Sequence, residues 1–203
     1  MPGEQVLNTG CNFNFLSFIF IADTHGFLND FKKQEEIIGQ VNPQFVLAEQ
    51  LQDLCLDSSK KFNDIPENRK FILTQSTDVE KLIQLCRVKN ISLIGIDLFN
   101  FGFDKDLQDV INGKREPSKL EEDRLQSILF QRQEHHLSII QKYQKKSSKP
   151  IVIIQGAWHL QEDSLLMQSL DNYLVIYPAN ASGEMLLEPS SNKDIEYKTR
   201  IKQ

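Results

Sequence analysis

Four short apolar segments of this sequence are each followed by side chains that can do acid–base or metal chemistry. These are Asp23 and His25 after the first segment, Glu49 after the second, Asp97 after the third and His159 after the fourth. Carboxylates and imidazoles serve as general acids and bases and as ligands of divalent metals. Parallel strands deliver the residues at their carboxyl ends to one edge of a sheet, where ligands bind. The sequence therefore predicts one shared site at that edge.

Five apolar runs have the length and composition of β-strands, and they cover residues 15–22, 45–48, 91–96, 151–155 and 173–177. The runs are nearly continuous in apolar character, as expected for strands buried on both faces. Stretches with helical spacing separate them. We therefore expect an α/β fold in three layers, in which helices cover a mostly parallel, Rossmann-like sheet of about five strands. Residues 1–203 are expected to form one domain, with an extended tail after about residue 181.

A long helix is predicted to begin after Ser118 and to reach about Lys146, because Ser118 and Glu121 have the S-x-x-E spacing of a capping box. The inward stripe of this helix is apolar except at Arg132 and His136. Burying an unpaired guanidinium costs several kcal/mol. Arg132 should therefore meet a carboxylate, a backbone carbonyl or an anionic ligand.

Two aromatic features lie beside the expected site. Trp158, the single tryptophan, stands directly before His159 in the sequence GAWH. The polar, loop-like stretch at residues 99–117 begins with FNFGF, close to Asp97, and such a segment can line an apolar pocket. Trp158 is accordingly a candidate binding residue, while ordinary packing remains open for both features.

Composition narrows the classes of partner. The 28 acidic and 23 basic residues give a net charge of −5, which does not attract nucleic acid. Three cysteines without a C-x-x-C pair predict neither a disulfide framework nor a structural zinc site. The apolar run that ends before Asp23 is too short for a membrane span or a signal core. We expect a cytoplasmic protein with a small-molecule or peptide substrate, no membrane or nucleic-acid partner, and an oligomeric state that the sequence leaves open.

Asp23-Thr24-His25 resembles the D-x-H motif that opens the calcineurin-like metallophosphoesterases, in which the Asp and His are metal ligands. The later GDxxD and GNHD motifs of that family are missing, and residues 156–159 keep only the last His of its GHxH motif. This family is an alternative that rests on one motif.

A second resemblance extends over residues 15–177. The chain is similar to the clan that contains the erythromycin esterases, the TraB and Tiki proteins and the ChaN-like haem-uptake proteins. The matching pieces, in order, are Thr24-His25-Gly26, residues 43–49 (P-x-x-V-x-x-E), residues 94–97 (IGID), Arg132, and residues 151–160, which end in a strand and GxxHL. This resemblance implies a site with His25, Glu49 and His159 at its core and with Asp97 and Arg132 close by.

The leading hypothesis is a hydrolase that activates water between these groups. Without a metal, His25 or His159 would be the general base, oriented by Glu49, and Arg132 would stabilise an oxyanion. With a zinc, manganese or iron ion, His25, Asp23, Glu49 and His159 would supply the ligands, and an inward His136 would add a third imidazole. The sequence does not choose between these versions. A protein that binds haem or a small anion in the same crevice without turnover is the alternative.

Overall fold

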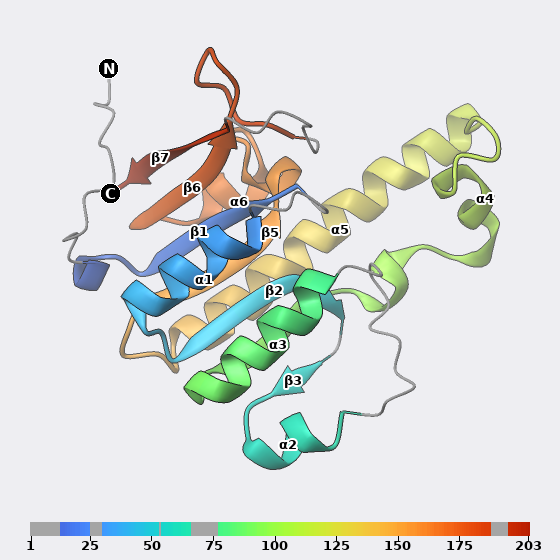
Figure 1. Cartoon of the computed structure of the whole chain (residues 1–203). Coiled ribbons are helices and arrows are strands. Elements are labelled where there is room, and N and C mark those ends of the chain that lie inside the picture. The colour runs from blue at the N-terminus through green and yellow to red at the C-terminus, as the bar shows by residue number, and fades with distance from the viewer. Residues whose placement is uncertain (1–12, 25–29, 53, 66–76, 188–194) are drawn as a thin grey trace.

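The computed structural model describes residues 13–24, 30–52, 54–65, 77–187 and 195–203, and its centre is a sheet of seven strands in the order β3-β4-β2-β5-β1-β6-β7 (Figure 1). The strands are β1 (Phe18–Asp23), β2 (Phe45–Gln52), β3 (Cys55–Leu56), β4 (Ser92–Asp97), β5 (Ile151–Gly156), β6 (Tyr173–Ala179) and β7 (Glu196–Lys202). The central strands β4, β2, β5, β1 and β6 pair in parallel, while β3 and β7 join the two edges antiparallel.

Strand β5 lies between β1 and β2, although it follows both in the chain. Its residues pair with Phe18–Asp23 on one side, and Val152–Ile154 pair with Val46–Ala48 on the other. The ends of β1, β5 and β2 therefore meet at the middle of the sheet. This is the kind of place where open α/β sheets bind ligands.

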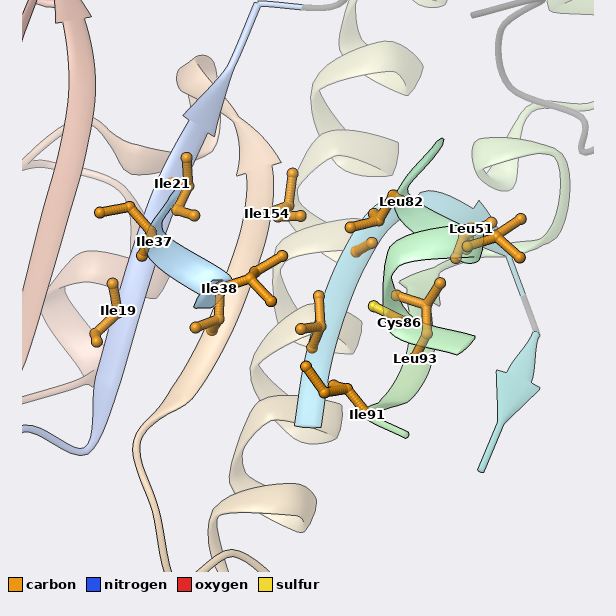
Figure 2. Close-up of a cluster of buried hydrophobic side chains, with 14 of the residues drawn as sticks. Ile19, Ile21, Ile37, Ile38, Leu51, Leu82, Cys86, Ile91, Leu93 and Ile154 are labelled. Carbon is orange, nitrogen blue, oxygen red and sulfur yellow. The ribbon is translucent and has the colours of Figure 1, made fainter. Parts of the chain in front are cut away.

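Helices cover both faces of the sheet. One face carries α1 (Asp30–Val41) and α3 (Thr77–Lys89), and Figure 2 shows the isoleucines of α1 packed over those of β1 and β5. The other face carries α5 (Lys119–Gln144) and α6 (Leu165–Ser169), which pack on a second apolar cluster that includes Ile140. Burying each large aliphatic side chain contributes about 1.5–3 kcal/mol. The predicted α/β layering is confirmed.

The number of strands predicted from the sequence was wrong. The five apolar runs do form β1, β2, β4, β5 and β6, but β3 and β7 were missed. Strand β7 pairs along its whole length with β6. Part of the stretch predicted as an extended tail is therefore an edge strand of the sheet.

The capping box of α5 is present, because the Ser118 hydroxyl accepts from the Glu121 N–H and the Glu121 carboxylate accepts from the Ser118 N–H. Buried residues of α5 occur only in its second half, at His136, Ile140 and Tyr143. The first half continues past the sheet toward α4 (Gln108–Ile111), as Figure 1 shows. Short 3-10 turns, η2 (Phe99–Gly102) and η3 (Lys105–Leu107), connect β4 to α4.

The remaining short elements are η1 (Phe13–Phe15), α2 (Ser59–Asn63) and η4 (Ala157–Leu160). Among the described helices, none combines the length and the apolar character that crossing a membrane requires.

Candidate functional site

Five of the polar residues singled out from the sequence form one connected network at the carboxyl edge of the sheet. They are Glu49 from β2, Asp97 from β4, Arg132 and His136 from α5, and His159 from η4. Glu49 is the first polar residue after the apolar run of β2, and Asp97 is the last residue of β4. Arg132 and His136, four residues apart, lie on the same face of α5 and point toward that edge.

Glu49 stands where β2 separates from β5. The parallel pairing of these strands stops at Ala48, and the register between β2 and β4 shifts over the residues that follow. Glu49 Oε2 accepts a 2.6 Å hydrogen bond from the freed Gly156 N–H. Its Oε1 accepts from Arg132 Nη2 at 2.8 Å and lies 3.2 Å from His159 Nε2. Both oxygens of this buried carboxylate are thus satisfied.

Arg132 is the cation that joins the two acids. Its Nε and Nη2 donate to Asp97 Oδ1 and Oδ2 at 3.0 and 2.6 Å, and Nη2 also donates to Glu49. The guanidinium carbon lies 5.1 Å from the centre of the Phe101 ring. The expectation that Arg132 meets a carboxylate is confirmed. Nη1 is left as the nitrogen that makes no hydrogen bond to the described part of the chain.

His136 lies fully buried beneath this ion pair. Gln155 Nε2 lies 2.7 Å from His136 Nδ1, and His136 Nε2 lies 3.3 Å from Asp97 Oδ1. An amide NH₂ can only donate, so Nδ1 is the acceptor and the ring proton is assigned to Nε2. Burial lowers the pKa of His136 against the raising effect of Asp97, so this imidazole is held neutral.

Burial alone would raise the pKa of both acids, but their partners reverse the direction. His159, His136 and Arg132 hold the pKa of Glu49 well below its ordinary value. Hydrogen bonds from His136 and Arg132 lower the pKa of Asp97. The pKa of Arg132 is raised by the two carboxylates despite its burial. The network therefore keeps two carboxylates and one guanidinium charged.

His159 is held by a short polar chain of its own. Its carbonyl oxygen accepts from the Ser164 hydroxyl at 2.8 Å, and that hydroxyl in turn caps α6 by accepting from the Met167 N–H. The residue is only 4% exposed, and its ring lies 5.1 Å from that of His136. Nε2 faces Glu49, while Nδ1 has no hydrogen-bond partner among the described residues.

A pocket of about 890 Å³ opens above this network. Glu49, Arg132 and His159 line it, whereas Asp97 and His136 do not and lie beneath it. Trp158 also lines the pocket and is 57% exposed. The sequence left open whether the aromatic segment after Asp97 lines a pocket or only packs, and the structure places Phe101 and Phe103 in the wall of this pocket.

Asp23 lies at the end of β1 and also lines the pocket. Its carboxylate accepts a hydrogen bond from Gln50 Nε2. Thr24, the next residue, donates through its N–H and its hydroxyl to Asp30 at 2.9 and 3.1 Å. His25, predicted as a core catalytic residue and metal ligand, lies outside the described residues.

The described residues by themselves do not make a metal site. No group of three or more His, Cys, Asp or Glu side chains among them has an arrangement that could hold an ion. Glu49 and Asp97 already use both oxygens on Arg132, on a histidine or on a backbone N–H. A metal version of the site needs a ligand from outside the described residues, and His25 is the one that the sequence suggests.

Two residues of the site were not singled out from the sequence, and the contact that a third makes with Arg132 was not foreseen. Gln155 fixes His136, Gln50 binds Asp23, and Phe101 covers Arg132. A signal for the first two is present in hindsight, because Gln50 and Gln155 are amides at the ends of apolar strands. The approach of Phe101 depends on a 3-10 turn that no local pattern indicates.

No protein-family model, curated protein or solved structure that we compared with the chain matches it. The resemblance to the GxxH-containing clan therefore rests on the motifs quoted above. A function has to be argued separately, from the geometry of the site.

Proposed function

We propose that this protein is a hydrolase, related to the erythromycin esterase, TraB–Tiki and ChaN-like clan, that activates water with a histidine–carboxylate pair. The observation that carries the proposal is the contact between Glu49 and His159 at the floor of the pocket. A carboxylate facing Nε2 favours a proton there and leaves Nδ1 as a base. Nδ1 is buried and has no hydrogen-bond partner among the described residues, so a water molecule has to enter beside it for this base to act.

In this mechanism water gives its proton to His159 Nδ1 while its oxygen attacks a carbonyl carbon. Glu49 stabilises the imidazolium that results, as the acid of a catalytic triad does. Arg132 Nη1 donates to the oxyanion that develops on the carbonyl oxygen. The proton on Nδ1 then passes to the leaving group. Asp97 acts as a positioning residue because it holds Arg132 without lining the pocket, and His136 in turn holds Asp97.

The test compares His159→Gln and Glu49→Gln with a matched control, His135→Gln, which changes a half-buried histidine of α5 that does not line the pocket. A panel of esters, lactones, peptides and phosphoesters is used, so that the metallophosphoesterase alternative is covered. Loss of a general base should lower kcat/KM about 10²- to 10⁴-fold for the site variants and leave the control unchanged. Undiminished hydrolysis by both site variants would overturn the proposal.

His25 and a metal are tested separately. We keep His25 in the proposed site because of the clan resemblance, and His25→Ala should lower turnover on the same panel. Elemental analysis of the purified protein before and after chelation decides between the two versions of the mechanism. A stoichiometric zinc, manganese or iron ion that is lost in His25→Ala would establish the metal version.

A binding protein without turnover is the second candidate, and the size of the pocket favours it. A volume of about 890 Å³ is in the range of sites for small molecules and cofactors. The ligands expected from the sequence are haem or a small anion near Arg132 and His159, and an anion would have to overcome the carboxylates of Asp23, Glu49 and Asp163 that also line the pocket. Saturable binding with no turnover of any panel substrate would support it over the hydrolase.

A further inference from the structure

The pocket has two chemically distinct parts, and together they specify a ligand. Its wall is apolar, built mainly from the β4–α5 connection and the overhanging half of α5, with Trp158 at its margin. The side chains of this apolar wall are Phe101, Phe103, Ile111, Leu129, Phe130 and Trp158. Leu129 and Phe130 remain 41% and 52% exposed, and clustered exposed apolar residues commonly mark a binding site.

The floor disfavours an anion. Asp23, Glu49 and Asp163 line the pocket, against Arg132 as its only lysine or arginine among the described residues. The charge of Arg132 is already matched by two carboxylates at 2.6 and 2.8 Å. A ligand carboxylate entering here would meet a negative field and lose its own hydration. An uncharged head group avoids both costs.

Two residues that line the pocket, Gln50 and Arg132, each have an atom that could form a hydrogen bond with a ligand. Gln50 is 7% exposed, and its Nε2 is directed to Asp23, so its Oε1 is an acceptor. This buried Oε1 has no partner among the described residues, whereas buried side-chain oxygens usually accept a hydrogen bond. Arg132 Nη1 is a donor in the same pocket. A ligand with one N–H and one carbonyl oxygen would satisfy both atoms.

We propose that the pocket binds an uncharged amphiphile in which a carboxamide head group is joined to an extended apolar body. The idea that this amide is a substrate rests on the proposed hydrolase function. The idea that it binds does not. Hydrolysis would add water across the C–N bond and give a carboxylic acid and either ammonia, from a primary amide, or an amine. The acid would ionise in a negative field, which favours its release.

The experiment measures binding by calorimetry with four probes: octanamide, hexanamide, methyl octanoate and octanoate. Octanamide should bind about fifteenfold more tightly than hexanamide, since each methylene buried contributes about fourfold. It should bind at least about tenfold more tightly than methyl octanoate, which leaves Gln50 Oε1 unpaired. Octanoate should bind most weakly of the three probes that share an eight-carbon acyl chain.

Two exposed positions on α5 provide matched variants. Phe130→Ser removes part of the apolar wall and should weaken octanamide about tenfold. Leu120→Ser changes a side chain that is 72% exposed and does not line the pocket, and it should have no effect. Gln50→Leu should reduce the preference for octanamide over methyl octanoate. If that variant does not fold, the comparison of the two probes on the unaltered protein still tests whether the pocket prefers an amide.

The outcomes separate this inference from the proposed function. In one outcome octanamide binds as expected, mass spectrometry detects no octanoate, and no panel substrate is hydrolysed. That result would support the proposed ligand class and exclude the proposed hydrolase function. Hydrolysis confined to charged or short substrates removes the ligand class and keeps the hydrolase. Binding of octanoate as tight as that of octanamide, or no binding of any probe, overturns the inference.

Discussion

Arg132 and Asp97 form a two-point ion pair that fastens helix α5 to the end of strand β4. Arg132 Nε and Nη2 lie 3.0 and 2.6 Å from Asp97 Oδ1 and Oδ2, and the Asp97 side chain is fully buried. Such a pair need not exceed an apolar replacement in stability, because both charges lose hydration. Removing one partner is different, since it leaves the other charge buried without compensation.

Asp97→Asn should therefore destabilise the protein by about 3–5 kcal/mol. The comparison is Arg124→Gln, which breaks an ion pair with Asp104 in which both side chains are over 40% exposed. An exposed pair contributes only about 0–1 kcal/mol. Urea unfolding of both variants checks the prediction. An equal loss of unfolding free energy in the two variants would show that burial does not make the Asp97 pair more important than the exposed pair.

Gly95 allows β4 to pass close to the irregular part of β2. A Cβ atom built at Gly95 would lie 2.3 Å from the carbonyl oxygen of Leu51, which is backbone and cannot move aside freely. Gly95→Ala should destabilise by about 1–3 kcal/mol or more through overpacking. It should also disturb Glu49, because Gly95 pairs with the neighbouring Ala48.

Gly39→Ala is the matched control for that prediction. Gly39 lies inside α1 with nothing within 4 Å of its added Cβ, so alanine should stabilise by about 0.5–1 kcal/mol. Opposite signs in urea unfolding are expected for the two substitutions. A loss of stability at both positions would mean that the tight contact at Leu51 is not the cause.

The strands and the polar residues at their ends could be predicted because both signals are local. A strand buried on both faces is a continuous apolar run, and Glu49, Asp97 and His159 follow the ends of such runs. Arg132 was found because a charged residue interrupted an apolar stripe. Each of these inferences uses only neighbouring residues and the periods of the helix and the strand.

The order of the strands could not be read in the same way. Residues 151–156 do not indicate that β5 lies between β1 and β2, because the order of the strands depends on the packing of the whole sheet. Strand β7 was missed because EYKTRIK has no apolar run. Its alternation of Tyr197, Thr199 and Ile201 is a period-2 signal typical of an edge strand, and it could have been recognised.

The contribution of Asp30 to the stability of the protein should fall with rising pH. Burial raises its pKa from 3.8 to about 6, although Thr24 and the Tyr197 hydroxyl, 2.7 Å away, donate to it. Between these two pKa values the folded state binds more protons than the unfolded state. Stability due to Asp30 is therefore complete below pH 3.8 and is lost as the pH rises through about 6, a loss of about 3 kcal/mol.

The measurement compares the unaltered protein with Asp30→Asn from pH 4 to pH 7, because Glu49 and Asp97 titrate in the opposite sense and cancel in the difference. The stability of the unaltered protein relative to the variant should fall across this range. A difference that stays constant with pH would show that folding does not raise the pKa of Asp30.

Cys86 should report the opening of the core. It lies fully buried between α3 and the sheet, and burial raises the pKa of its thiol to about 12. Cys55 is half-buried at the sheet edge, and Cys11 lies outside the described residues. In a Cys11→Ser background, iodoacetamide at pH 8 should modify Cys55 in the folded protein. Cys86 should react only after unfolding, since about 10⁻⁴ of a thiol with that pKa is ionised at this pH and the reagent cannot reach it. Modification of Cys86 at the rate of Cys55 would contradict this and would mean that α3 separates from the sheet under native conditions.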